Sequence, residues 1–222
     1  MNHGRQAFDR EIQALEHDLL EMGSRAETMV GLAADALADL DVGTAMEVIR
    51  MDDAVDAQDL AIESQCLRVL ALHQPQATDL RLVGSVMKIV TDIERIGDLA
   101  VDVAKIALKV DKELGSSGAI DIRRMSGTAR TMFRESLVAF ARRDLDRVDT
   151  VERLEDEVDA LYREYRAQIF ADMTSEGANV VCSGWLLMAV HHVERIADHA
   201  MNIAERVHFM VTGDIRPKPQ VA

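Results

Sequence analysis

The chain of 222 residues carries a formal net charge of −14 and is 48% hydrophobic but only 4% aromatic. That hydrophobic fraction is enough for a packed core, which excludes an intrinsically disordered chain. The excess of acids argues against binding nucleic acid or anionic lipid through a general field, because phosphate groups are bound by basic surfaces. Three prolines in the whole chain favour long, uninterrupted helices.

Cys66 and Cys182 both lie in apolar stretches, outside any Cys-x-x-Cys pair. We interpret them as small buried hydrophobes in a reducing compartment. The N-terminal residues are polar and charged, unlike a signal peptide. The longest run without Asp, Glu, Lys or Arg, residues 177–193, contains Asn, Ser and two His, which makes it a poor membrane span. These features predict a cytoplasmic protein.

Apolar residues at alternating steps of four and three, from Phe8 to Leu40, predict the first long helix. Gly43 and Thr44 are expected to supply the following turn and N-cap. The second helix is predicted over residues 45–72.

The inward row of that second helix is interrupted by Asp52 and Asp59, and a charge on such a row needs a partner or a cation. The third helix is predicted over residues 79–112 and capped by Thr78 or Asp79. Glu94, Asp98 and Asp102 run beside its apolar row.

The clearest linker is the Gly- and Ser-containing stretch 113–118, and the plan repeats after it. We expect an all-α fold of six long antiparallel helices in two tandem, similar three-helix bundles. Residues 1–114 would form the first repeat and residues 119–212 the second. Residues 213–222, with two prolines, are expected to form a flexible tail.

The strongest sign of duplication is the stretch 91–104, which recurs as 191–204. Both copies contain Glu-Arg-Ile, an Asp two residues later and then, two residues on, Ala. The resulting Glu-x-x-x-Asp spacing places both carboxylates on one helix face. With 39 acids in the chain, one such pair is more simply read as a solvated helix face.

Two pairs at matching positions in both halves are harder to assign to chance. Like charges at i,i+4 destabilise a helix by a few tenths of a kcal/mol, and a multivalent cation between two pairs would reverse that effect. We therefore predict a metal site built twice, from Asp52, Asp56, Glu94 and Asp98 in the first half and Glu155, Asp159, Glu194 and Asp198 in the second. Carboxylate ligands suit iron, manganese, magnesium or calcium.

Further candidate ligands lie close to these acids in the sequence. Asp102 continues the first-half row, and Asn202 takes its place in the second. His192 and His199 are either additional ligands, which would favour a transition metal, or ordinary surface or core histidines.

Two arginines follow the repeated glutamates directly. Arg95 and Arg195 either pair with a neighbouring acid or present a charge to a protein partner.

Motifs of catalysis are not apparent: the sequence contains no Gly-x-Gly-x-x-Gly, P-loop, Gly-x-Ser-x-Gly or His-Glu-x-x-His. Di-iron oxidases in helical bundles use Glu-x-x-His pairs, whereas here His191 precedes Glu194. We expect no enzyme, and we keep a carboxylate-ligated metalloenzyme, a ferritin-like oxidase or a hydrolase, as the alternative. An adaptor needs its acids on the surface, whereas an oxidase needs an enclosed site.

The repeated stretches Asp-Ile-Glu-Arg-Ile-Gly-Asp at 92–98 and Val-Glu-Arg-Ile-Ala-Asp at 193–198 resemble the PhoU family of phosphate-transport regulators. Gln-Pro-Gln-Ala-Thr-Asp-Leu-Arg-Leu at 74–82 supports the resemblance, which covers nearly the whole chain. It implies two similar three-helix bundles with multinuclear iron, zinc or manganese clusters on the four acid pairs. The second copy departs from the first at Ala197 and Asn202, so the two clusters could differ in metal or nuclearity.

The resemblance also implies a regulatory role. The protein would repress phosphate uptake and the phosphate-starvation response by contacting the ATPase subunit of the phosphate ABC transporter and a sensor histidine kinase. It would reach the membrane only through these partners. From the long acidic helices we also expect a homodimer.

Overall fold

The computed structural model describes residues 2–110 and 120–215, and the regular structure within these ranges is entirely helical. This confirms the all-α prediction. The helices are α1 (Asn2–Asp39), α2 (Val42–His73), α3 (Thr78–Ala107), α4 (Ile122–Arg142), α5 (Leu145–Met173) and α6 (Val180–Thr212). Within these ranges, none of the helices is both long and apolar enough to cross a membrane.

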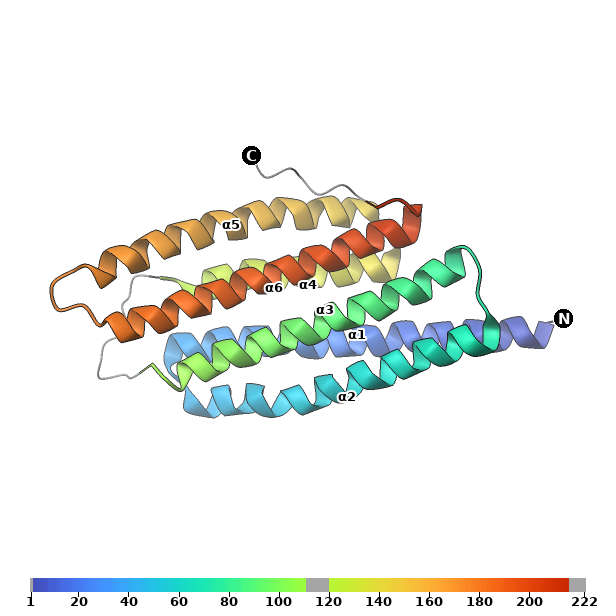
Figure 1. Cartoon of the computed structure of the whole chain (residues 1–222), viewed down its shortest axis with the longest axis horizontal. Coiled ribbons are helices and arrows are strands. Elements are labelled where there is room, and N and C mark those ends of the chain that lie inside the picture. Colours follow the sequence, from blue (N-terminus) through green and yellow to red (C-terminus); the bar gives the residue numbers. More distant parts are fainter. Residues whose placement is uncertain (1, 111–119, 216–222) are drawn as a thin grey trace.

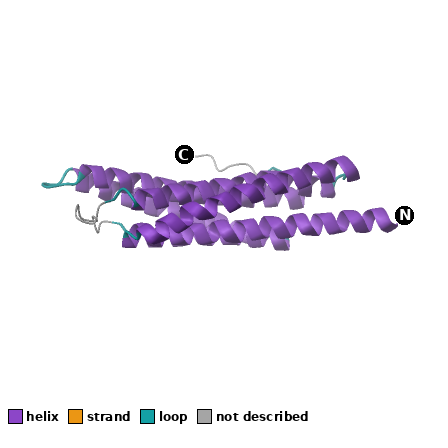
Figure 2. Cartoon of the chain, turned by 90° about the horizontal axis from the view of Figure 1, so that it is seen from below, coloured by secondary structure: helices purple, strands orange, loops and turns teal. Residues whose placement is uncertain are grey.

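The helices form an elongated molecule of two layers (Figures 1 and 2). Four of them lie side by side in one layer, in the order α2, α3, α6 and α5, and α1 and α4 pack behind this layer. Helices α1, α2 and α3 contact one another, as do α4, α5 and α6. Two similar three-helix bundles are therefore present, as the sequence predicts.

Helices α3 and α6 join the two bundles along their length and run antiparallel (Figure 1). Near the middle, His199 Nδ1 lies 2.8 Å from Asp92 Oδ1. Toward the start of α3, Arg81 Nε donates to the carbonyl oxygen of Met210 at 3.5 Å, near the end of α6.

A second antiparallel pair, α1 and α4, joins the bundles at the back through ion pairs. Arg123 Nε lies 2.7 Å from Asp35 Oδ1, and Arg143 pairs with Glu16 at the other end. Because each joining contact is made by equivalent helices running in opposite directions, an approximate two-fold rotation relates the halves.

The buried side chains form one continuous apolar cluster that extends through both bundles. On α2 the inward row is occupied as predicted, since its apolar members are buried: Val48, Val55, Ile62, Cys66 and Val69. Asp52 and Asp59, which interrupt that row, are half-buried. Neither Cys66 nor Cys182 forms a disulfide, and both are buried, as their apolar surroundings in the sequence predict.

The predicted turn between the first two helices was wrong in detail. Asp41 caps α2, and its Oδ1 accepts hydrogen bonds from the amides of Gly43 at 2.8 Å and Thr44 at 3.3 Å. Leu40, not a glycine, takes the positive φ of 52° at the bend. Asp41, three residues before Thr44 and directly after the bend, therefore takes the place of the expected Thr44 cap, since its carboxylate reaches two amides at the start of the helix.

The start of α3 also differs from the prediction. Ala77 precedes the helix with φ 49° and ψ −117°, and no side chain caps it. Thr78 and Asp79 are therefore the first residues of the helix and not its cap.

The end of α3 is at Ala107, five residues before the predicted Lys112, which lies outside the described residues. The linker 113–118 and most of the tail 213–222 also lie outside them. The division at residues 114 and 119 accordingly stays a prediction, as does the flexible tail.

Candidate metal centres

The α2–α3 pair brings the four first-half candidates to one interface. Asp52 is half-buried, and its nearest interacting charges include Asp56, one turn along α2, and Asp98 across on α3. Glu94 is likewise half-buried and interacts with Asp98, Asp59 and Asp56. The two acid pairs thus face each other across a helix contact, as predicted from their spacing.

Burial and mutual repulsion raise the pKa values of the inner acids in this cluster. The pKa of Asp52 is raised first by burial and then by Asp56 and Asp98. The pKa of Glu94 is raised first by burial and then by Asp98. Oδ1 of Asp52 is buried and has no hydrogen-bond partner. These carboxylates therefore favour either a proton or a cation.

The close approach of α3 to α2 at this cluster occurs at Gly97. A Cβ placed there would lie 3.3 Å from Cγ1 of Val55 and 3.8 Å from Oδ1 of Asp52. The second half has Ala197 at the equivalent position, and it is buried. Because a methyl group occupies this space in only one half, the surroundings of the two clusters are not identical.

The α5–α6 pair gathers the four second-half candidates in the same way. Glu155 on α5 interacts with Asp159 on its own helix and with Asp198 on α6. Glu194 interacts with Asp198 and with Asp159. In each of the four pairs the first acid is half-buried, which places it nearest the helix contact.

The second cluster shows the largest carboxylate shift. Burial, followed by the charges of Asp159 and Asp198, raises the pKa of Glu155 to about 7. Burial and Asp198 also raise the pKa of Glu194, whose Oε2 is buried without a hydrogen bond. His191 Nδ1 lies 3.4 Å from that oxygen and would pair with it when protonated.

Both arginines of the repeated motif pair with the acids beside them. Arg95 lies 3.3 Å from Glu94 and 2.9 Å from Asp98, while Arg195 lies 3.8 Å from Asp198. Their side chains remain about half exposed, at 55% and 48%. The local ion pair, one of the two roles considered from the sequence, is therefore present, and contact with a partner stays a prediction.

The other four candidate ligands lie along the α3–α6 contact instead. Both His199 and Asn202 contact Asp92 of α3. The Nδ2 atom of Asn202 donates a hydrogen bond of 3.4 Å to Oδ1 of Asp92. Burial lowers the pKa of His192, while Asp102 across the contact acts to raise it. Sequence proximity grouped these residues with the acids, but the helix rotation directs them toward the opposite bundle.

Two acidic residues that interact with the predicted ligands were not themselves predicted as ligands. Asp59 interacts with Glu94 in the first cluster, and its position on the inward row of α2 was the signal for it. Asp92 is the partner of His199, but nothing in its spacing distinguished it from a surface acid.

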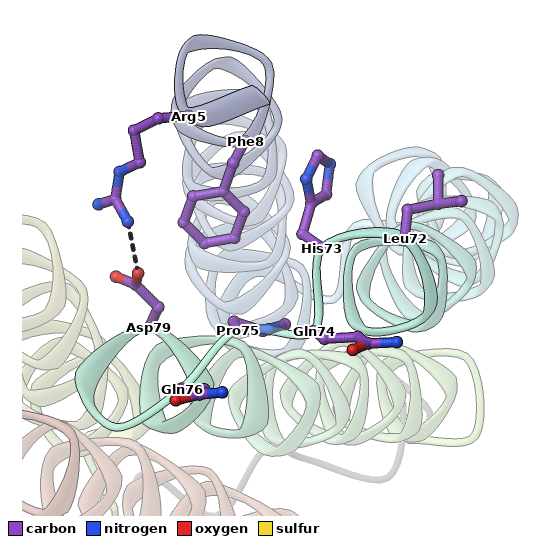
Figure 3. Close-up of a pocket in the computed structure, with 8 residues that line it drawn as sticks. All are labelled: Arg5, Phe8, Leu72, His73, Gln74, Pro75, Gln76 and Asp79. Atoms are coloured by element: carbon purple, nitrogen blue, oxygen red, sulfur yellow. Dashed lines mark hydrogen bonds and ion pairs between the residues drawn. The ribbon is translucent and has the colours of Figure 1, made fainter. Parts of the chain in front are cut away.

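A pocket of about 480 Å³ lies apart from both clusters, at the turn between α2 and α3 (Figure 3). Arg5 and Asp79 form an ion pair of 2.9 Å across it, and none of the candidate ligands lines it. Its walls include much of the stretch that supports the PhoU resemblance, and the lining residues are Arg5, Phe8, Leu72, His73, Gln74, Pro75, Gln76 and Asp79.

The two clusters suit a cation chemically. Each contains hard carboxylate oxygens from two helices and one buried oxygen without a hydrogen bond, on Asp52 or Glu194. As the side chains stand, no group of three or more His, Cys, Asp or Glu within 2–110 and 120–215 is arranged to hold a metal ion. Metal binding is therefore a proposal.

Known proteins share this architecture. The family model described as the PhoU domain matches residues 19–107 and 122–207. A phosphate-specific transport system accessory protein PhoU homolog from Deinococcus radiodurans is 34% identical over 94% of this chain and 98% of its own. Its counterpart from Pseudomonas aeruginosa is 36% identical over 97% of this chain and 90% of its own.

Solved structures agree with this relationship. The crystal structure of PhoU from Pseudomonas aeruginosa superposes with a TM-score of 0.89, covering 93% of this chain and 100% of that one at 36% identity. The phosphate transport system regulatory protein PhoU from Streptococcus pneumoniae gives 0.87, covering 95% and 99% at 29% identity.

Fold and site together define a class: six-helix proteins made of two similar three-helix bundles, each with paired acids between its second and third helices. The chain belongs to the PhoU family. The resemblance seen in the sequence motifs is thereby confirmed.

Proposed function

We propose that this chain is a metal-binding regulatory adaptor of phosphate homeostasis. It would restrain phosphate uptake and the phosphate-starvation two-component response by contacting the ATPase subunit of the phosphate ABC transporter and the sensor histidine kinase from the cytoplasmic side. Support comes from the relatives named as accessory or regulatory proteins of phosphate transport. The observation that carries the metal-binding part is the facing of two acid pairs in each half.

In each half the cation would be held by the two facing pairs. Asp52, Asp56, Glu94 and Asp98 would hold it in the first half, and Glu155, Asp159, Glu194 and Asp198 in the second. A bound cation neutralises charges that otherwise repel one another, so it would tie α2 to α3 and α5 to α6. Iron, zinc or manganese are the favoured metals, with magnesium or calcium as alternatives.

The position of the acids favours an adaptor over an oxidase. The outer member of three of the four pairs, Asp56, Asp159 and Asp198, is exposed at the surface. A ferritin-like oxidase would place its carboxylates inside a closed bundle, where water is excluded. We therefore infer a protein without catalytic activity.

Metal content tests the site assignment. Protein purified without added metal is analysed by inductively coupled plasma mass spectrometry, with Glu94→Gln and Glu194→Gln combined in one variant. We expect the variant to lose most of the bound metal, because one carboxylate is removed from each cluster. The matched control is Asp53→Asn with Asp156→Asn, which removes two exposed acids at equivalent places on α2 and α5. Equal metal in all three proteins would remove the assignment.

Regulation is tested separately in a bacterial strain that lacks its own PhoU. The parent chain should repress alkaline phosphatase in phosphate-rich medium, and the strain without it should express the enzyme. Failure to repress, with normal protein levels, would contradict the regulatory role whatever the metal content.

The oligomeric state is part of the proposal. We propose a homodimer, whose mass by light scattering would be twice the 24.6 kDa of the chain. A monomer mass at micromolar concentration would contradict it.

A further inference from the structure

A pocket of about 260 Å³ lies at the joint between the two bundles, where α3 and α6 run side by side (Figure 1). It is lined by two residues of α3 and by a stretch near the end of α6, namely Lys88, Asp92, Asn202, Glu205, Arg206 and Phe209. Its volume is just below the range of about 300 to 1,000 Å³ that is typical of pockets for drug-sized ligands. A ligand bound here would therefore be small, and it would touch both bundles.

Two cations from different bundles line this pocket without an ion-pair partner. Neither Lys88 of α3 nor Arg206 of α6 forms an ion pair with an acid in residues 2–110 and 120–215, and Arg206 lies 5.7 Å from the centre of the Phe209 ring. By contrast, Arg123 and Arg130, at the other joint between the bundles, pair with acids of α1. The ammonium and guanidinium donors in the pocket are therefore available to an anion.

The two acids that line the pocket are engaged with other groups. Oδ1 of Asp92 lies 2.8 Å from His199 Nδ1 and accepts a hydrogen bond of 3.4 Å from Asn202. Glu205 interacts with Glu155 of α5, so it lies toward the side of α6 that faces away from α3. A carboxylate at the edge of a pocket can accept hydrogen bonds from hydroxyl groups, as the acidic residue of dinucleotide sites does from ribose.

The approximate two-fold rotation shows that one large ring is missing beside this pocket. At the related place, Lys109 Nζ lies 4.1 Å from the centre of the Trp185 ring. On the side of the pocket, Phe209 stands at the position of Lys109, and Ser85 stands at the position of Trp185. Ser85 is fully buried, and its hydroxyl has no hydrogen-bond partner among the described residues. Less side-chain volume therefore lies between α3 and α6 here, which leaves room for a ring from outside.

We propose that this pocket binds a nucleoside monophosphate, with the phosphate between Lys88 and Arg206 and the base against Phe209. A phosphate monoester carries nearly two negative charges, which matches two cations better than a single carboxylate does. The flat base suits the aromatic ring, since such rings stack favourably. Glu205 and Asn202 supply an acceptor for the ribose hydroxyls and an amide for the base. The proposal uses none of the eight clustered acids, so it is independent of metal binding.

The test is isothermal titration calorimetry of the full chain with AMP, GMP, CMP and UMP. EDTA is present throughout, so that no metal ion bridges the phosphate to the acid clusters. We expect at least one of the four nucleotides to bind at one site per chain. Adenosine or the matching nucleoside, which lacks the phosphate, and inorganic phosphate, which lacks the ring, should each bind at least tenfold more weakly than that nucleotide.

The key variant combines Lys88→Gln with Arg206→Gln, which removes both cations from the pocket and should weaken nucleotide binding at least tenfold. Its control combines Arg50→Gln with Arg134→Gln, two exposed cations on α2 and α4 outside the pocket, so that the net charge changes equally. The control should bind the nucleotide as the parent chain does. Phe209→Leu keeps an apolar side chain without the ring, and it should weaken the nucleotide but leave the weak binding of inorganic phosphate unchanged.

The proposal is overturned if none of the four nucleotides binds the parent chain at millimolar concentration. It is also overturned if the pocket variant, folded by circular dichroism, binds as the parent chain does, or if the control variant loses binding equally. Inorganic phosphate binding as tightly as the nucleotide would remove the role of the ring. These outcomes do not depend on the reporter strain, so a chain that binds the nucleotide yet fails to repress keeps this site and loses the regulatory role.

Discussion

Replacing Glu155 by Gln should stabilise the metal-free protein at high pH. The pKa of Glu155 is raised from 4.5 to about 7, chiefly by burial and by the charges of Asp159 and Asp198. At about 1.4 kcal/mol per pKa unit, a shift of this size corresponds to a loss of about 3 kcal/mol in folding stability at a pH where the carboxyl is ionised. Because about half of the group is exposed, solvent screening reduces this to about 1 kcal/mol.

The pH range follows from the direction of the shift. A carboxyl whose pKa is higher in the folded state binds its proton more tightly there, so folding is favoured below pH 4.5 relative to high pH. That advantage declines as the pH rises from about 4.5 to about 7, and above pH 7 the folded protein carries a crowded charge. Glutamine has nearly the same shape and no charge, so the variant should not show this decline.

Urea unfolding followed by far-ultraviolet circular dichroism, in EDTA at pH 5 and pH 8, measures the effect. The midpoint of the variant should exceed that of the parent chain by about 0.5 M at pH 8, with a much smaller difference at pH 5. Glu157→Gln, an exposed acid on the same helix, is the control and should change little. A variant no more stable than the parent chain at pH 8 would refute the assignment of crowding to Glu155.

Two further predictions concern the joint between the bundles and the core. Asp92→Asn should destabilise the protein by about 1 kcal/mol, because it weakens the partly buried 2.8 Å contact with His199. A double-mutant cycle with His199→Gln should give a coupling energy of similar size, and zero coupling would contradict the contact. Phe133→Ala on α4 should cost about 3 to 5 kcal/mol in urea unfolding, since its fully buried ring leaves a cavity. A loss below about 1 kcal/mol would show that the core closes around that position.

The helices and the acid clusters could be predicted because both depend on local spacing. Apolar steps of three and four predicted the inward row of α2, whose apolar members are buried and on which Asp52 is half-buried. Acids four apart must share a helix face, and short turns make neighbouring helices antiparallel. The position of Asp52 on the inward row of α2 adds that this face meets a neighbouring helix, and Asp98 of α3 does interact with it there.

The contact between the two bundles could not be predicted in this way. His199 and Asn202 were grouped with Glu194 because they are near it in sequence, yet they contact Asp92 of the other bundle. Which side of α6 meets α3 depends on how two complete bundles pack, and no local pattern encodes that choice. The cap at Asp41 and the uncapped start of α3 after Ala77 were missed for a related reason, since a bend at a non-glycine residue is set by the helices on either side.

The antiparallel pairing of α3 with α6 has a consequence for stoichiometry. A single chain already contains a dyad, so it can sit on the symmetry axis of a dimeric protein and touch both of its subunits alike. Two weak attachments made at once by one chain would be strengthened by their effective concentration, without any new contact. Cutting the chain between its repeats would then cost far more binding strength to such a dimer than the loss of half the surface.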